Sequence, residues 1–219
     1  MRYPRRVMEL SELRTSIHQE SDQMSVLNRA ASSRNAVTGL NSLIPQDWSI
    51  LYDISNCENP LHISALLNHV RFTEAILSRN PELATVKNSS GSTALHLASA
   101  EGNLEIVLKL LQHNKDPCLF HDEEGRIPLH YAAMRGRTKV AEELIKAKPD
   151  SLSLGDNYKK TAFHFCVKYN HLETLQALVK LDYAIAGDLL NFRRPDCAGN
   201  TVLHFAVKLN RAEVIRYLL

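Results

Sequence analysis

Apolar residues along the chain fall into paired blocks that are separated by polar turns. A short block contains Leu95 and Ala98, three residues apart on one helical face, and closes at Gly102, a residue type that tolerates the left-handed conformation of helix ends. The block that follows has the spacing of one face of a second helix: Leu104, Ile106, Val107, Leu110 and Leu111. This pattern predicts a short helix, a tight turn and a longer helix.

The paired blocks recur with a period of 34 residues. Five tetrapeptides are variants of one helix start: Asn59-Pro60-Leu61-His62, Thr93-Ala94-Leu95-His96, Ile127-Pro128-Leu129-His130, Thr161-Ala162-Phe163-His164 and Thr201-Val202-Leu203-His204. Their histidines are separated by 34, 34, 34 and 40 residues, and a degenerate copy upstream places Leu27 34 residues before Leu61. Self-similarity at this period indicates repeats that stack on their neighbours in a linear array.

Each repeated position has a physical role. Thr or Asn three residues before the histidine can cap a helix, and proline in the next position fits the first helical turn. A small residue two positions after the histidine lets a neighbouring helix approach closely: Ser64, Ala98, Ala132, Cys166 and Ala206. Gly or Asn six positions after the histidine ends the first helix: Asn68, Gly102, Gly136, Asn170 and Asn210. Between the units, tetrads such as Asp122 to Gly125 have the composition of tight turns.

These motifs resemble ankyrin repeats, whose signature joins a Thr-Pro-Leu-His helix start to a turn and a second helix. A tetratricopeptide array has the same period, but the only tryptophan, Trp48, lies outside the pattern that such an array requires. The resemblance implies an all-α ankyrin-repeat solenoid, built of helix-turn-helix units joined by β-turn or hairpin loops. In such an array the turns and the first helices form a cupped binding surface.

The resemblance covers residues 25–219, and residues 1–24 are expected to form a lead-in that is partly helical or disordered. We place the repeat boundaries at 25–58 (a divergent copy), 59–92, 93–126, 127–160, 161–200 and 201–219. The fifth of these carries six extra residues within Asp182 to Pro195. We expect this insertion to lengthen a loop without disturbing the stacking.

The last helix pair ends at Leu219, which aligns with Leu111 of an earlier repeat, and no polar capping repeat follows it. We expect the final unit to offer an apolar face to a neighbour that this sequence lacks: Val207, Val214, Ile215, Leu218 and Leu219. The chain is therefore expected to be a piece of a longer array or of a longer protein.

The sequences of several repeats are similar to those of plant ankyrin proteins of the defence-associated bian-da and accelerated-cell-death types. The stretches that carry this resemblance are Asn59-Pro60-Leu61-His62, Ser78 to Leu83, Ala132 to Arg137 and Cys166 to Asn170. Such proteins carry membrane-spanning helices after the array, introduced by a Pro-Gly-Gly motif, and this sequence contains neither. The resemblance implies an interaction scaffold in intracellular signalling or plant defence. The alternative is the cytosolic array of a membrane-anchored signalling or transport protein whose transmembrane region is missing here.

Composition and charge exclude several classes of function. The net charge is +2, from 26 basic and 24 acidic side chains, which does not indicate a nucleic-acid-binding protein. No apolar run approaches the roughly 18 residues that span a bilayer, and no secretory signal follows Met1. Four scattered cysteines favour a reducing, intracellular and cytoplasmic location. The protein would associate with the plasma membrane if its parent carries C-terminal spans.

No set of residues has the arrangement of a catalytic, cofactor, metal or small-molecule site, so we predict that the chain is not an enzyme. The repeated histidines lie one repeat apart, whereas zinc ligands must converge within about 2.1 Å of one point. In ankyrin repeats this histidine bonds to backbone groups of adjacent turns, which implies a structural role for His62, His96, His130, His164 and His204. Cys166 occupies the small-residue position and is expected in the core.

Positions that vary between the repeats are free to recognise a partner. On the turns and on the first helices, the residue types enriched at protein interfaces gather in the third and fourth full repeats. The candidate protein-binding residues are Arg126, Met134, Arg135, Tyr158, Lys160, Lys168, Tyr169 and Lys208. Because cations predominate among them, we expect a protein partner with an acidic segment. The alternative is that they are ordinary solvated side chains.

Overall fold

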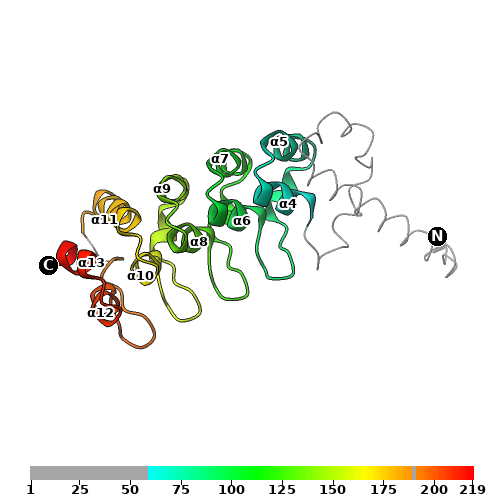
Figure 1. Ribbon diagram of the computed structural model, residues 1–219. Helices are drawn as coiled ribbons and strands as arrows, with labels where there is room; N and C mark the ends of the chain where they lie inside the picture. Colours follow the sequence, from blue (N-terminus) through cyan, green and yellow to red (C-terminus); the bar gives the residue numbers. More distant parts are fainter. Residues whose placement is uncertain (1–58, 189–190) are drawn as a thin grey trace, which may run out of the picture.

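The computed structural model describes residues 59–188 and 191–219, and the predictions for 1–24 and 25–58 lie outside them. The described residues form helix pairs that stack in single file, with the first helices in one row, the second helices in another, and long loops along the free edge of the first row (Figure 1). No strand occurs among the described residues. The predicted all-α solenoid is confirmed.

The helices follow the predicted order of a short and a longer element. The first helices are α4 (Pro60–Leu67), α6 (Ala94–Glu101), α8 (Pro128–Met134), α10 (Ala162–Lys168) and α12 (Val202–Lys208). The second helices are α5 (Val70–Arg79), α7 (Leu104–His113), α9 (Thr138–Ala147), α11 (Leu172–Ala186) and α13 (Ala212–Leu218). Three 3-10 helices follow the earlier second helices: η1 (Pro81–Thr85), η2 (Asp116–Leu119) and η3 (Pro149–Ser153).

The predicted side-chain cap is present at the start of α4, and the predicted left-handed residue ends each first helix; in α6, α10 and α12 the threonine hydroxyl bonds instead to Nδ1 of the repeated histidine. At the start of α4 the Asn59 side chain accepts hydrogen bonds from the backbone N–H groups of Leu61 (2.9 Å) and His62 (3.0 Å). The Gly or Asn six positions after each histidine has a positive φ: Asn68, Gly102, Gly136, Asn170 and Asn210. Glycine and asparagine adopt this conformation at low cost, which is why the chain turns there into the second helix.

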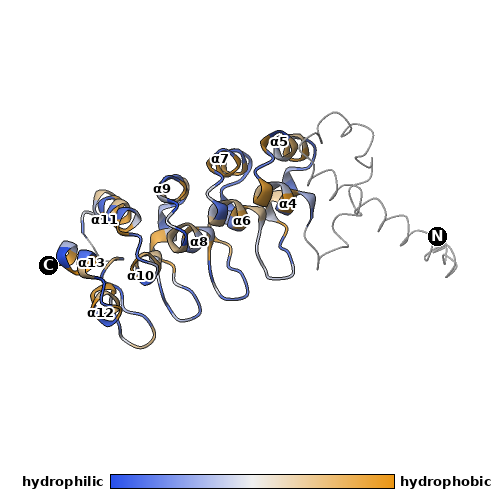
Figure 2. Cartoon of the chain, viewed as in Figure 1, coloured by the Kyte–Doolittle hydropathy of each residue, from blue (hydrophilic) through white to orange (hydrophobic). Residues whose placement is uncertain are grey.

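The core is a continuous apolar layer between successive helix pairs. Figure 2 shows apolar residues on the helices and polar residues along the loops. The small residue two positions after each histidine is fully buried in all five repeats: Ser64, Ala98, Ala132, Cys166 and Ala206. Ser64 satisfies its hydroxyl by bonding to the hydroxyl of Thr73 at 2.9 Å. A larger side chain at these positions would push neighbouring first helices apart.

The repeated histidines join each unit to the next turn. In His130, the Nδ1 atom accepts the N–H of Ile127 (3.2 Å), so Nε2 carries the proton and donates to the carbonyl of Leu154 (3.1 Å). Equivalent Nε2 bonds join His62 to Ser92, His96 to Phe120 and Arg126, and His164 to Asn200. Burial lowers the pKa of His62, His96 and His130 to about 4, so these rings are neutral at pH 7.

The insertion in the fifth repeat lengthens a helix, so the expectation of a longer loop is wrong in part. Helix α11 has 15 residues, against 10 in α5, α7 and α9, and ends at Gly187 with φ 71°. The chain then returns to the array because the buried carboxylate of Asp182 accepts hydrogen bonds from the Asn191 side chain (2.9 Å) and the Phe192 N–H (3.1 Å). The Phe192 ring packs edge-on against Phe163, with the ring centroids 5.6 Å apart.

The final repeat only partly exposes the apolar face expected of it. Val207 is 60% exposed and Leu219 is 91% exposed, while Ile215 and Leu218 pack partly against the core. The prediction for Val214 is wrong, because its side chain is fully buried. Val214 lies on the face of α13 that packs inward on its own repeat, and the sequence pattern alone did not separate that face from the outer one.

Candidate protein-binding surface

The loop edge of the array is built from tight turns of one design. In the turn 122–126, the Asp122 side chain accepts the N–H groups of Glu124 (2.9 Å) and Arg126 (2.8 Å). Asn88, Asp156 and Asp196 bind their own turns in the same way. Because the first residue of each turn satisfies two backbone donors, the turn tips hold a defined shape without a partner.

Neighbouring turns are also joined to one another through the backbone. The N–H of Glu123 donates to the carbonyl of Ser90 (3.2 Å), and that of Asn157 donates to the carbonyl of Glu124 (3.2 Å). A third bond of this kind joins the N–H of Cys197 to the carbonyl of Tyr158 (2.9 Å). The turn tips therefore form one continuous ridge, in which residues of successive repeats lie side by side.

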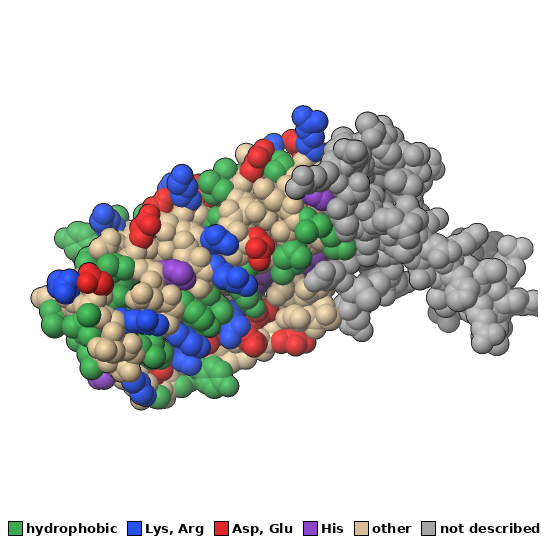
Figure 3. All heavy atoms as spheres, viewed as in Figure 1, with side chains coloured by type: hydrophobic (Ala, Val, Ile, Leu, Met, Phe, Trp, Pro, Cys, Tyr) green, Lys and Arg blue, Asp and Glu red, His purple; other side chains and the backbone are tan. Residues whose placement is uncertain are grey.

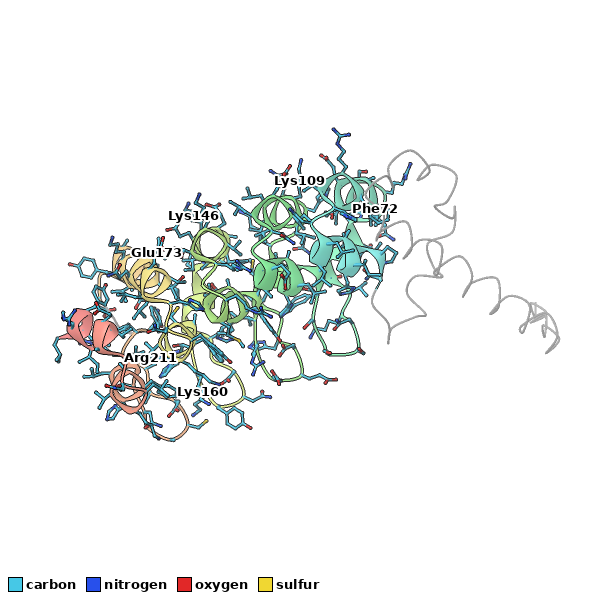
Figure 4. All side chains as sticks on the ribbon, in the orientation of Figure 1. Phe72, Lys109, Lys146, Lys160, Glu173 and Arg211 are labelled. Atoms are coloured by element: carbon cyan, nitrogen blue, oxygen red, sulfur yellow. The ribbon has the colours of Figure 1, made fainter. Side chains whose placement is uncertain are left out.

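Two of the candidate binding residues are exposed tyrosines, one on the turn before α10 and one at the end of α10. Tyr158, at a turn tip, is 64% exposed, and Tyr169, at the end of α10, is 40% exposed. Each ring has an ammonium group above it, from Lys160 at 4.9 Å and from Lys168 at 5.3 Å. These cation–π contacts orient both rings and leave faces of the rings in solvent. Figure 4 places Lys160 at the loop edge, away from Lys146 and Glu173 on the second helices.

Arg126 is the candidate cation whose charge is paired with a carboxylate of the described chain. Its guanidinium forms an ion pair with Glu124 and lies over the rings of Tyr131 (6.0 Å) and Phe165 (5.8 Å). Tyr131 in turn donates its hydroxyl proton to the carboxylate of Asp122 at 2.6 Å. The Arg126 side chain is only 24% exposed, and its charge is compensated locally by Glu124. Arg126 thus stiffens the base of its turn and offers little free positive charge.

The remaining candidates lie at varied depths. Met134 packs partly against the core, and its carbonyl accepts a hydrogen bond from Nε2 of His171 (3.1 Å). Arg135 is exposed at the end of α8. Lys208 is exposed at the end of α12, where it borders a shallow depression of about 480 Å³ that also involves Leu203, His204 and Val207. Lys208 therefore lies apart from the tyrosine pair.

Sequence reasoning missed the residue that directly follows each repeated histidine. In the described repeats this position holds Ile63, Leu97, Tyr131, Phe165 and Phe205. Tyr131 and Phe165 hold Arg126 in place, and Phe165 also packs on His130 with ring centroids 5.3 Å apart. The signal was available, because an aromatic side chain appears at this position only from the third full repeat onward.

Charge is divided unevenly along the ridge. The turn 122–126 carries Asp122, Glu123, Glu124 and Arg126, whereas the next turn carries Lys159 and Lys160 with only the buried Asp156 against them. Figure 3 shows Lys and Arg side chains gathered on the loop edge near α10, with Asp and Glu side chains on the neighbouring part toward α6. The sign of the surface charge therefore changes between adjacent turns.

Comparison with known families agrees with this architecture. A family model described as "Ankyrin repeats (3 copies)" matches residues 27–121 and 116–187, and one described as "Ankyrin repeat" matches residues 198–219. The chain belongs to the ankyrin-repeat family. A search of curated proteins found no match to the chain.

Ankyrin repeats generally mediate protein–protein interaction and are typically non-catalytic. Within residues 59–188 and 191–219, no three His, Cys, Asp or Glu side chains are grouped so that they could hold a metal ion. In the same ankyrin units no helix has the length and apolarity needed to cross a bilayer. Burial raises the pKa of the Cys118 thiol to about 12 and also raises that of Cys166, so neither forms a reactive thiolate at pH 7.

Proposed function

We propose that the chain is a non-catalytic scaffold that binds a protein segment across the turn tips and first helices of residues 122–169. The observation that carries the proposal is the pair of exposed tyrosines, Tyr158 and Tyr169, each fixed under a lysine ammonium group. Tyrosine supplies a large contact area and loses few rotatable bonds on binding, which makes it common at interface hot spots.

The surrounding geometry supports the same surface. The turns are held by Asp122 and Asp156 and joined to each other through the backbone, so the partner would meet a surface that needs little ordering. A preorganised surface keeps more of its contact energy as affinity. Lys160 and Lys168 lie over the tyrosine rings, and Arg135 is exposed at the end of the neighbouring helix α8; these cations favour acidic residues in the partner.

We propose the biological process from the resemblance to plant ankyrin proteins, and the cellular compartment from the free thiols. The similarity of the repeat sequences to those of plant defence-associated ankyrin proteins supports a role in intracellular signalling or defence. Among the described residues, Cys118, Cys166 and Cys197 are free thiols, which is typical of a reducing compartment such as the cytoplasm. The repeat boundaries placed from the sequence also remain part of this proposal.

A second candidate function is that of the cytosolic array of a membrane-anchored signalling or transport protein. The exposed outer face of the last repeat, with Val207 at 60% and Leu203 at 38% exposure, favours it, because such a face ordinarily packs against further structure. Sequencing the transcript beyond Leu219 distinguishes the two functions. Apolar runs of about 20 residues there would support the membrane protein.

Binding can be tested without a known partner. A random library of 16-residue peptides displayed on phage is selected on the wild-type chain, and the affinities of the recovered peptides are measured by fluorescence anisotropy. We expect Tyr158→Ala and Tyr169→Ala each to weaken binding by more than ~1 kcal/mol, about fivefold, because hot-spot contacts are lost. Circular dichroism should show unchanged folding, since both side chains are exposed.

Tyr183→Ala is the matched control. Tyr183 is 63% exposed, nearly as much as Tyr158, but lies on α11 in the row of second helices. It should leave the affinities unchanged. Peptides that bind both tyrosine variants as tightly as the wild type would show that recognition occurs elsewhere on the chain.

A further inference from the structure

The charge reversal between two adjacent turns constrains the partner more closely than the proposed function does. The turn 122–126 has three carboxylates against the one guanidinium of Arg126, which leaves a formal charge of −2. The turn 156–160 has the two ammonium groups of Lys159 and Lys160 against the carboxylate of Asp156, which leaves +1. Lys168 extends the positive charge onto the end of α10.

The free charges on each turn are the ones that can meet a partner. Asp122 and Asp156 are occupied by backbone donors of their own turns, and Glu124 is paired with Arg126. Glu123 and Lys159 are exposed at the two tips, and no ion pair in the described chain involves either side chain. Glu123 is therefore the free anion of one tip, and Lys159 is the free cation of the next.

The spacing of the two tips follows from the backbone hydrogen bonds that close each turn and join it to the next turn. Each turn contributes two backbone segments to the ridge, and hydrogen-bonded segments lie about 4.8 Å apart, so successive tips are about 10 Å apart. The bond from the Asn157 N–H to the Glu124 carbonyl fixes the two turns in this register. An extended peptide advances about 3.3 Å per residue, so about three residues of a bound segment span the two tips.

We propose that the segment bound by this surface is bipolar: it places a cationic side chain against Glu123 and, about three residues along, an anionic side chain against Lys159 and Lys160. This inference rests on the proposed function and narrows its expected acidic partner. A uniformly acidic segment would meet the carboxylates of the turn 122–126, and the guanidinium of Arg126 is already compensated by Glu124. Like charges placed together act against such a partner.

The test uses the library-selected peptides and two charge-neutralising variants, Glu123→Gln and Lys159→Gln. From each selected peptide, one version without its cation and one without its anion are made by substitution with alanine. Double-mutant cycles on the anisotropy-derived affinities then measure the coupling between each protein charge and each peptide charge. Glu105→Gln, at an exposed site on α7, and Lys180→Gln, at an exposed site on α11, are matched controls on the second helices.

We expect Glu123 to couple with the peptide cation and Lys159 with the peptide anion, each by about twofold to fivefold, as exposed pairs do. Both couplings should shrink in 500 mM KCl because salt screens exposed charges. The controls should show no coupling. Selected peptides that carry only acidic residues, or cycles without coupling, would overturn the bipolar inference while the tyrosine variants still lose binding. If the tyrosine variants retain binding, or if no peptide is selected, the proposed function fails and the inference fails with it.

Discussion

Helices α8 and α12 begin with the same kind of motif, but the surroundings of the two motifs differ. Leu129 and His130 are fully buried, whereas Leu203 is 38% exposed and His204 is exposed. The local chemistry is alike in both, because the histidine Nδ1 accepts a backbone N–H three residues earlier at 3.2 Å in each case. The difference lies in the groups that later segments of the chain place around each motif.

The segment after the second helix and the first helix that follows it provide contacts that residues 201–219 do not have. The carbonyl that accepts the Nε2 proton of His130 belongs to Leu154, 24 residues further along, and Phe165 of the following α10 packs on the His130 ring. His164 has the same relation to Asn200 and Phe205. In a solenoid each repeat is stabilised mainly by its nearest neighbours. The same motif therefore contributes more to the free energy of unfolding where a following unit packs on it than in residues 201–219.

Mild acid should have the largest effect on this arrangement. Burial lowers the folded-state pKa of His62, His96 and His130 to about 4, while the unfolded chain keeps values near 6.5. The unfolded state therefore takes up protons first, and stability that is complete above pH 6.5 is lost as the pH falls toward 4. Each unit of pKa shift corresponds to about 1.4 kcal/mol of unfolding free energy. Protonation of all three histidines should therefore cost more stability than any of the single substitutions below.

Urea unfolding followed by circular dichroism at pH 7, 6, 5 and 4 measures this loss. The variant His130→Asn should show a shallower decline between pH 6.5 and 4, because one titrating ring is removed. Burial alone would raise the pKa of Asp196, but hydrogen bonds from Asn200 and Ala198 outweigh it and lower the pKa, so this carboxylate adds to the loss of stability mainly at the lowest pH of the series. A midpoint that stays constant from pH 7 to 4 would mean that the rings are not held neutral by the fold.

The next largest effect should separate the inner histidine from the terminal one. His130→Ala leaves the buried Ile127 N–H and Leu154 carbonyl without partners, which costs about 1–3 kcal/mol for each unsatisfied group. In His204→Ala the freed groups of Thr201 can reach water, since His204 is exposed. We expect the urea midpoint of His204→Ala to change by less than half as much as that of His130→Ala. Equal shifts would contradict the nearest-neighbour account.

The smallest effect should come from two glycines at equivalent turn positions. Gly125 (φ 73°) and Gly199 (φ 77°) both adopt the left-handed conformation, so alanine costs about 1 kcal/mol at either site. At Gly125 the added Cβ would also lie 2.7 Å from the backbone nitrogen of Asn157, whereas nothing lies within 4 Å at Gly199. We expect Gly125→Ala to lower the thermal midpoint further than Gly199→Ala. The reverse order would mean that the turn tips are not packed together.

The sequence period was enough to predict most of the fold, because each recurring residue type meets a local need. Capping by Asn59, the left-handed Asn68 and the buried Ala132 all follow from such needs. Departures from the period were harder to predict. The residues that extend α11 have no counterpart in the other repeats. The same is true of the buried Asp182, which holds the returning chain through hydrogen bonds from Asn191 and Phe192.

The sequence by itself determined the helix order, the turn positions and the small buried residues of the first helices, since these depend on spacing and on backbone preference. Only the tertiary structure decided which candidate binding groups are available. Arg126 is partly covered because Tyr131 of α8 and Phe165 of α10 pack against its guanidinium, while Tyr158 remains in solvent. The physical reason is that the exposure and the free charge of a side chain depend on groups brought near it by stacking, which no single repeat encodes.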